Sequence, residues 1–269
     1  MDPRIMGILN VTPDSFSDGG EWFAFDRAVE HARTLIAEGA DILDVGGEST
    51  RPRAEPVAVD EELRRVVPVV RALRGAGAQI SVDTAKLTVA EAAVDAGATY
   101  VNDVTALRED PEMAGLVAES GADCCLMHML GEPRTMQDDP RYDDVVDDVR
   151  AFLEARVEFA VREGVREERI MVDPGIGFGK TLEHNLELLR RLDRIATIGL
   201  PVVIGTSRKS FLGRLTGRAD PHDRVAATVA TTVLALERGA SVFRVHDVAP
   251  TRDALAVATA TLRADGARG

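Results

Sequence analysis

Polar and charged residues recur directly after short apolar runs in this sequence, and their side chains suit two kinds of ligand. Asp83, Asn102 and Asp173 supply carboxylate and amide groups, which can accept hydrogen bonds from the N–H donors of a flat heterocycle. A second set is basic and suits an anionic group; its members are Arg51, Arg208, Lys209, Arg244 and His246. If both sets share one site, that site accepts a heterocycle together with a phosphate-like anion.

The apolar runs that precede these residues predict eight β-strands, at residues 5–9, 42–45, 79–82, 100–102, 124–127, 170–172, 202–204 and 242–245. Before five of the strands, a helix-like stretch ends in Gly-Ala, with the glycine at position 39, 77, 97, 121 or 239. Glycine just past a helix end adopts the left-handed conformation without a side-chain penalty. Each junction therefore indicates a helix that ends and a strand that begins.

Strands that alternate with helices predict a parallel sheet of the α/β class. Eight such units favour a closed (β/α)8 TIM barrel, and an open doubly wound sheet is the alternative. We expect one domain over residues 1–269, the usual size of such a barrel. A single Asp or Asn after a strand is more often a helix cap or a turn residue. Polar residues after all eight strands, from Asn10 to His246, instead predict one polar mouth at the C-terminal ends of the strands.

The composition of the chain argues against several classes of function. The formal net charge is −13 and no basic stripe is present, so we expect no nucleic-acid partner. No apolar run reaches the roughly 18 residues that span a bilayer, and no apolar leader opens the sequence, so we expect a cytoplasmic protein without a membrane segment. Cys124 and Cys125 are adjacent in an apolar run, which indicates buried thiols rather than a disulfide or a metal site.

The stretch from Gly175 to Thr181 has the look of a phosphate-binding P-loop but lacks its spacing. The motif needs a glycine five positions before Gly179, where Pro174 stands. The last glycine spacing also fails the dinucleotide-binding fingerprint. We therefore expect neither kind of nucleotide site here.

Seven segments of the sequence closely resemble the dihydropteroate synthase family, in the right order and over essentially the whole chain. They are GILNVTPDSFSDGG at 7–20, DVGGESTRP at 44–52, SVDT at 81–84, VNDV at 101–104, DPGIGFGK at 173–180, GTSRKSF at 205–211 and RVHDV at 244–248. The resemblance implies an enzyme of folate biosynthesis. Its reaction would join 6-hydroxymethyl-7,8-dihydropterin pyrophosphate to p-aminobenzoate, giving 7,8-dihydropteroate and pyrophosphate.

The resemblance also implies roles for the matching residues. Around the pterin ring it places Asp83, Asn102, Asp173, Phe178 and Lys209, and around the pyrophosphate it places Arg244 and His246. Asn10 matches the side chain near a Mg²⁺ cofactor, which would be held mostly by phosphate oxygens and water. Ser207 would lie beside p-aminobenzoate, and Phe16, Asp18, Thr50 and Arg51 match segments that close over the site and help to form that pocket.

Displacement of pyrophosphate would develop positive charge on the heterocycle and negative charge on the leaving group. Asp83 can stabilise the first charge, and Mg²⁺ with Arg244, His246 and Arg51 the second. Lys209, Phe16 and Asp18 complete the residues expected to act in catalysis. The family's usual homodimer is expected. Two alternatives are a catalytically silent pterin-binding paralogue and a methyltetrahydrofolate–corrinoid methyltransferase, although the latter has no pyrophosphate to bind.

Lysine is rare in this chain and occurs only at positions 86, 180 and 209. At position 209 we expect a requirement for a compact ammonium, because it must reach an oxo group and a ring nitrogen at the edge of the pterin. Lys86 is expected to lie exposed in the third helix. A change of Lys86 to arginine would then have little effect.

Overall fold

A closed barrel of eight parallel strands forms the centre of the protein, in a computed structural model that describes residues 2–12, 20–49 and 54–266. The strands are β1 (Arg4–Asn10), β2 (Ile42–Gly46), β3 (Gln79–Asp83), β4 (Tyr100–Asp103), β5 (Asp123–Met127), β6 (Ile170–Asp173), β7 (Val202–Ile204) and β8 (Ala240–Val245). Each strand pairs with the next, and β8 closes the barrel by pairing with β1. All eight predicted strands are confirmed, and the open-sheet alternative is wrong.

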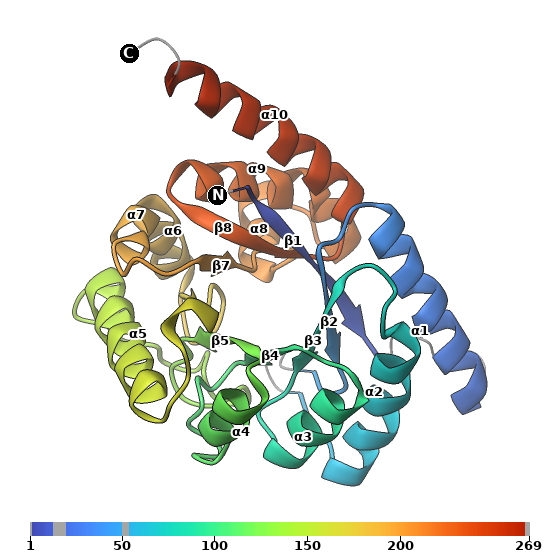
Figure 1. Cartoon of the computed structure of the whole chain (residues 1–269). Coiled ribbons are helices and arrows are strands. Elements are labelled where there is room, and N and C mark those ends of the chain that lie inside the picture. The colour runs from blue at the N-terminus through green and yellow to red at the C-terminus, as the bar shows by residue number, and fades with distance from the viewer. Residues whose placement is uncertain (1, 13–19, 50–53, 267–269) are drawn as a thin grey trace.

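Helices surround the barrel on the outside (Figure 1). They are α1 (Gly20–Ala37), α2 (Val59–Leu73), α3 (Leu87–Ala96), α4 (Met113–Ser120), α5 (Val145–Arg162), α6 (Leu182–Arg190), α7 (Leu192–Ala196), α8 (Ser210–Thr216), α9 (Val225–Glu237) and α10 (Val248–Gly266), with the short 3-10 helices η2 (Glu167–Arg169) and η3 (Pro221–Arg224). The C-terminal end of α10 extends beyond this ring. None of the helices in the described part of the chain is both long and apolar enough to cross a membrane.

Two apolar layers hold the barrel together. The larger lies between the strands and the helices, where one face of α2 contributes Val66, Val69, Val70 and Leu73 at helical spacing. The smaller fills the barrel with one side chain from each of seven strands: Met6, Ile42, Tyr100, Cys125, Met171, Val203 and Val242. The interior is therefore a packed core, and ligands can approach only at its ends. Both cysteines are buried and free, as expected, and burial raises the pKa of Cys124 to about 12.

The five Gly-Ala junctions lie where helices give way to strands, as predicted. All five glycines have positive φ, for example +101° at Gly39 and +67° at Gly121. An L side chain is strained in that conformation, so glycine lets the chain reverse towards the next strand.

The prediction for Lys86 is wrong. This residue precedes α3 rather than lying on its exposed surface, and its ammonium donates hydrogen bonds to Glu48, to Glu62 and to the carbonyl oxygen of Val57. Glu62 projects from α2 and is only 1% exposed. The Lys86 ammonium therefore bridges the loop after β2 and helix α2. These partners are distant in the sequence, so the local sequence around Lys86 does not reveal them.

Candidate active site

Residues from neighbouring strands lie level with one another at the C-terminal mouth of the barrel. Parallel pairing aligns Asn10 with Gly46, Gly46 with Asp83, and Asp83 with Asn102. Gly46 has no side chain between these two residues, and a Cβ atom there would lie in ordinary contact with Asp83, 3.5 Å from its Oδ2. The predicted convergence of these residues on one mouth is confirmed.

Arg244 on β8 joins two buried carboxylates below this opening. Its Nε donates to Asp44 Oδ2 and its Nη2 donates to Asp83 Oδ2, both at 2.6 Å. Asp44 also accepts hydrogen bonds from Ser81 Oγ at 2.6 Å and from Asn102 Nδ2 at 3.0 Å. One carboxylate on β2 is thus linked to β3, β4 and β8.

The environment of Asp83 makes it a weak acid. Burial raises the pKa of Asp83 to about 7; Arg244 opposes this shift, whereas the carboxylates of Asp44, Glu62 and Asp103 add to it. Burial alone would lower the pKa of Arg244, but its carboxylate partners outweigh burial and raise it. Arg244 is therefore a permanent cation, while Asp83 can change its charge near neutral pH.

Asp173 ends β6, and Lys209 lies in the loop after β7, directly before α8. Asp173 Oδ1 accepts a hydrogen bond from the backbone N–H of Gly175 at 2.6 Å, and burial raises the pKa of this carboxyl against the opposing charge of Lys209. Lys209 donates to the carbonyl oxygen of Ile176, and its Nζ lies 4.7 Å from the centre of the Phe178 ring. Burial lowers the pKa of Lys209 to about 8, although Asp173 opposes this. A carboxylate, an ammonium and an aromatic wall therefore adjoin, as predicted.

The loop between β6 and α6 packs against the end of β5. Gly175 has a φ of +66°, and a Cβ atom there would lie 1.9 Å from the carbonyl oxygen of His128, so the position requires glycine. Lys180 is buried, and its Nζ lies 2.9 Å from both His128 Nδ1 and the carbonyl oxygen of Phe178. Burial lowers the pKa of His128 to about 2, so this imidazole is neutral. Lys180 supports the loop from within, which agrees with the rejection of a P-loop.

Hydrogen bonds and an ion pair connect the loops that follow β7 and β8. Ser207 Oγ accepts from the backbone N–H of His246 at 3.0 Å and lies 2.9 Å from His246 Nδ1. The guanidinium of Arg208 donates to both carboxylate oxygens of Asp247, at 2.9 and 2.6 Å. The sequence groups Arg208 with the anion-binding cations, and the structure places it in this internal ion pair, just as it pairs Arg244 with Asp44 and Asp83. Ser207, expected beside p-aminobenzoate, thus lies in contact with His246, expected beside the pyrophosphate.

Four predicted site residues, Phe16, Asp18, Thr50 and Arg51, lie outside the described part of the chain. The other predicted site residues are described and lie at or after the C-terminal ends of strands, except Arg244, which lies within β8: Asn10, Asp83, Asn102, Asp173, Phe178, Ser207, Lys209, Arg244 and His246.

Asp44 was missed by sequence reasoning, although it accepts hydrogen bonds from two predicted site residues, Asn102 and Arg244. A signal was present: Asp44 is an acidic residue within an otherwise apolar strand, and burying a carboxylate is costly unless it is paired. Such a residue indicates an internal polar network. Its partners on three other strands could not be identified from local sequence.

Comparisons with known proteins agree with this site. Residues 6–246 match the family described as pterin binding enzyme. The dihydropteroate synthase of Escherichia coli (strain K12) is 46% identical over 263 residues, which cover 97% of this chain and 93% of that protein. A probable bifunctional folylpolyglutamate synthase/dihydropteroate synthase of Haloferax volcanii is 50% identical over 257 residues, covering 96% of this chain but 30% of that longer protein.

Solved structures show the same similarity. Xanthomonas albilineans dihydropteroate synthase with 4-aminobenzoic acid has a TM-score of 0.92 and 50% identity, covering 97% of this chain and 93% of that one. The enzyme of the same organism in complex with 7,8-dihydropteroate has a TM-score of 0.88 and 48% identity, covering 97% and 94% of the two chains. The chain therefore belongs to the pterin-binding enzymes and, within them, to the dihydropteroate synthases, which are transferases of folate biosynthesis.

Proposed function

We propose that the mouth of the barrel binds 6-hydroxymethyl-7,8-dihydropterin pyrophosphate and transfers its pterin methylene to the amine of p-aminobenzoate. The observation that carries this assignment is the placement of Asp83, Asn102, Asp173 and Lys209 at one mouth together with the cation Arg244. Related structures that hold 4-aminobenzoic acid or 7,8-dihydropteroate support it.

The pterin ring would lie between the two sides of the mouth. Asp173 can accept hydrogen bonds from the amino and ring N–H groups of the pterin, and Lys209 can donate to its oxo group. The Phe178 ring lies beside the Lys209 ammonium and would form one wall of the slot. Burial of these groups strengthens their interactions with a ligand that displaces water.

The bond between the methylene carbon and the pyrophosphate oxygen breaks, and a bond to the amine nitrogen forms. Positive charge that develops on the heterocycle is stabilised by the Asp83 carboxylate, and negative charge on the leaving pyrophosphate by Arg244 and His246. A neutral arylamine is already a nucleophile, so no strong base is required before attack. The amine releases its proton afterwards. We therefore favour a dissociative displacement.

A magnesium ion is also proposed at this site. In the described ranges of the chain, no group of three or more His, Cys, Asp or Glu side chains could hold a metal ion. Asn10 offers one amide oxygen at the end of β1, in register with Gly46 at the end of β2. This donor set fits Mg²⁺, which keeps several waters and binds through substrate phosphates. When bound, the ion would neutralise charge on the pyrophosphate.

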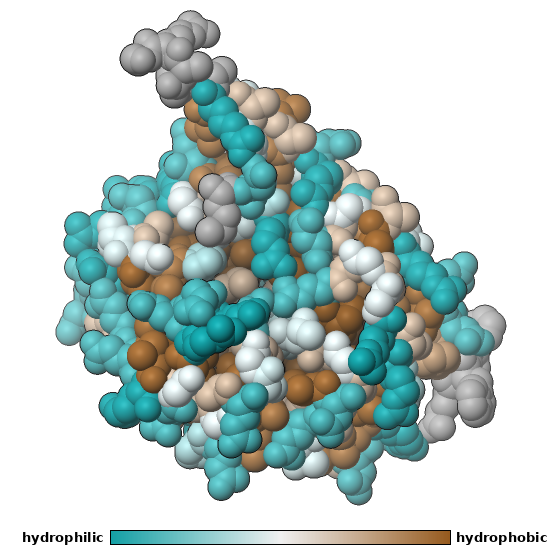
Figure 2. Space-filling view, in the orientation of Figure 1, coloured by the Kyte–Doolittle hydropathy of each residue, from teal (hydrophilic) through white to brown (hydrophobic). Residues whose placement is uncertain are grey.

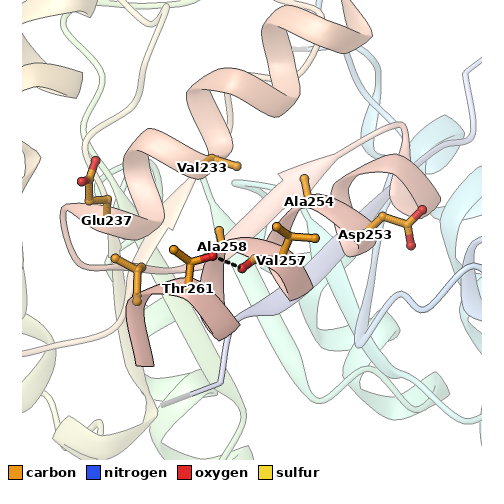
Figure 3. Close-up of a pocket in the computed structure, with 8 residues that line it drawn as sticks. Val233, Glu237, Asp253, Ala254, Val257, Ala258 and Thr261 are labelled. Carbon is orange, nitrogen blue, oxygen red and sulfur yellow. Dashed lines mark hydrogen bonds between the residues drawn. The ribbon is translucent and has the colours of Figure 1, made fainter. Parts of the chain in front are cut away.

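We further propose a cytoplasmic homodimer. An apolar groove lies between α9 and α10, away from the mouth (Figure 3), and is lined by Val233, Glu237, Asp253, Ala254, Val257, Ala258, Thr261 and Leu262. Val257 is 69% exposed, and apolar atoms follow α10 on the surface (Figure 2). A second copy would cover this face. Val257→Asp should then shift the mass measured by light scattering from dimer to monomer.

The test of the reaction is to supply the purified chain with pterin pyrophosphate, p-aminobenzoate and Mg²⁺ and to measure dihydropteroate and pyrophosphate. Equal amounts of both products are expected, with no dihydropteroate when p-aminobenzoate is replaced by benzoate, which lacks the amine. Binding of the pterin without any turnover would identify a silent paralogue. Complementation of a strain that lacks dihydropteroate synthase provides the same test in cells.

A further inference from the structure

Asp44 is not among the residues proposed to contact the substrates, but it accepts hydrogen bonds from two residues that are, Asn102 and Arg244. The side chain is fully buried, and its carboxylate accepts hydrogen bonds from Ser81, Asn102 and Arg244. A buried carboxylate with partners is weak evidence for stability, because well-packed apolar residues often serve as well. The position therefore points to a role in the geometry of the mouth.

We propose that Asp44 is a positioning residue that determines which amide atom of Asn102 faces the pterin and how the Arg244 guanidinium is oriented beside the pyrophosphate. This inference rests on the proposed pterin site.

The first part of the argument concerns the amide of Asn102. Its Nδ2 donates to Asp44 Oδ2 at 3.0 Å. A carboxylate can only accept hydrogen bonds. If the Asn102 amide were turned over, its Oδ1 would face the Asp44 carboxylate, and two acceptors would oppose each other. Asp44 thus leaves Oδ1 as the atom that Asn102 offers to the mouth, where it can accept from a ring N–H of the pterin.

The second part concerns Arg244. Asp44 holds its Nε and Asp83 holds its Nη2, so two carboxylates fix the plane of the guanidinium. The charged groups that act on Asp83 come from four elements: Arg244 on β8, Asp44 on β2, Glu62 on α2 and Asp103 on β4. Among these, the Asp44 charge raises the pKa of Asp83. Removal of that charge should therefore lower the pKa of Asp83.

The experiment compares the parent protein with Asp44→Asn, with binding of 6-hydroxymethylpterin measured by calorimetry from pH 5.5 to 9. Asp44 Oδ2 accepts from both Asn102 and Arg244, so the oxygen of an asparagine can keep both hydrogen bonds while its NH₂ group faces Ser81. What this change removes is the negative charge beside Arg244 and Asp83. We expect the affinity for 6-hydroxymethylpterin to fall roughly tenfold. We also expect the acid limb of the binding profile, the low-pH range in which Asp83 becomes protonated, to move to lower pH. An unmoved limb would show that the Asp44 charge does not act on Asp83 and would overturn this second part of the inference. The orientation of Asn102 is tested separately, by the double-mutant cycle below.

Asp123→Asn is the matched control. Asp123 is another buried strand carboxylate with two partners, Gln79 at 2.7 Å and Arg169 at 3.0 Å, but it begins β5 at the opposite end of the barrel. The same chemical change there should alter pterin affinity less than about twofold and leave the pH profile unchanged. A tenfold loss in this control would show that any buried charge gives the effect, and so would contradict the proposal.

A double-mutant cycle tests whether Asp44 acts through Asn102. In the Asn102→Ala background, Asp44→Leu, which removes both acceptor oxygens, should cost clearly less affinity than it does in the parent. Equal costs in both backgrounds would refute the positioning of Asn102. A parent protein that binds no pterin would instead refute the proposed function, so the two failures are distinguishable.

If Asp44→Asn does not fold, a crystal structure of the unchanged protein with 6-hydroxymethylpterin decides the question. Asn102 Nδ2 should stay on Asp44, with Oδ1 facing a ring N–H of the ligand. An amide that turns its Nδ2 to the pterin would overturn the inference.

Discussion

Lys86 and Glu62 form an ion pair with an Nζ–Oε2 distance of 2.6 Å, and Glu62 is almost completely buried under the loop after β2. Thr84 Oγ donates to the other oxygen of Glu62 at 2.8 Å. Burial alone would lower the pKa of Lys86, but its hydrogen bonds to Glu48 and Glu62 outweigh burial and raise it. The pair therefore stays charged at neutral pH.

Lys86→Met should lower the free energy of unfolding by about 3 kcal/mol, because it leaves the Glu62 carboxylate buried without its cation. Adding Glu62→Gln should recover much of the loss. Urea denaturation measures both effects. Arg141→Met is the control, since its ion pair with Asp139 is exposed and should contribute under about 1 kcal/mol. A Lys86→Met protein as stable as the parent would contradict the assignment.

Asp83→Asn should change how stability depends on pH. The Asp83 pKa is about 7 in the folded protein against an ordinary value of 3.8, so the folded state binds the proton more tightly. Its contribution to stability is therefore full below about pH 4 and is lost as pH rises to about 7. Between about pH 4 and pH 7, the free energy of unfolding of Asp83→Asn should fall by about 2–4 kcal/mol less than that of the parent protein. Urea denaturation at four pH values tests this, and identical slopes for the two proteins would refute it.

Arg244→Ala should weaken binding of pterin pyrophosphate far more than binding of 6-hydroxymethylpterin, because only the first ligand carries the anion. The variant should also lose stability by about 3–5 kcal/mol, since Asp44 and Asp83 lose a shared cation. Calorimetry with both ligands separates the two effects. Arg208→Ala is the control: its partner is Asp247, so it should affect both ligands alike. Equal losses of both ligands in Arg244→Ala would count against the pyrophosphate role.

Lys209→Arg should keep the fold and the net charge but lose pterin affinity by roughly 1–3 kcal/mol, the cost of imperfectly paired buried groups. The reason is space: a Cβ atom at Gly177 would already lie 3.1 Å from Lys209 Cδ, and the ammonium fits between the Ile176 carbonyl and the Phe178 ring. Pterin affinity and melting temperature are the measurements. Arg141→Lys, at an exposed site, should change neither. An unchanged affinity in Lys209→Arg would reduce Lys209 to a general positive charge.

The eight strands and the mouth could be predicted from the sequence because their signals are local. A short apolar run and a Gly-Ala junction each span a few residues, and the polar residue at the end of a strand directly follows its apolar run in the sequence. Parallel pairing then requires that all C-terminal strand ends meet at one mouth. Asp83, Asn102, Asp173 and Lys209 were identified in this way, and the family resemblance added their roles.

The partners of these residues were decided only by the tertiary structure. Arg244 and Asp44 are 200 residues apart in the sequence, and Lys86 and Glu62 lie on different elements. Which side chain points into the barrel, and which charge lies opposite, depends on the register of strands and helices that closes only when the whole chain folds. For that reason the sequence placed Lys86 on the surface and assigned Arg208 to a ligand, whereas folding gave each an internal carboxylate partner.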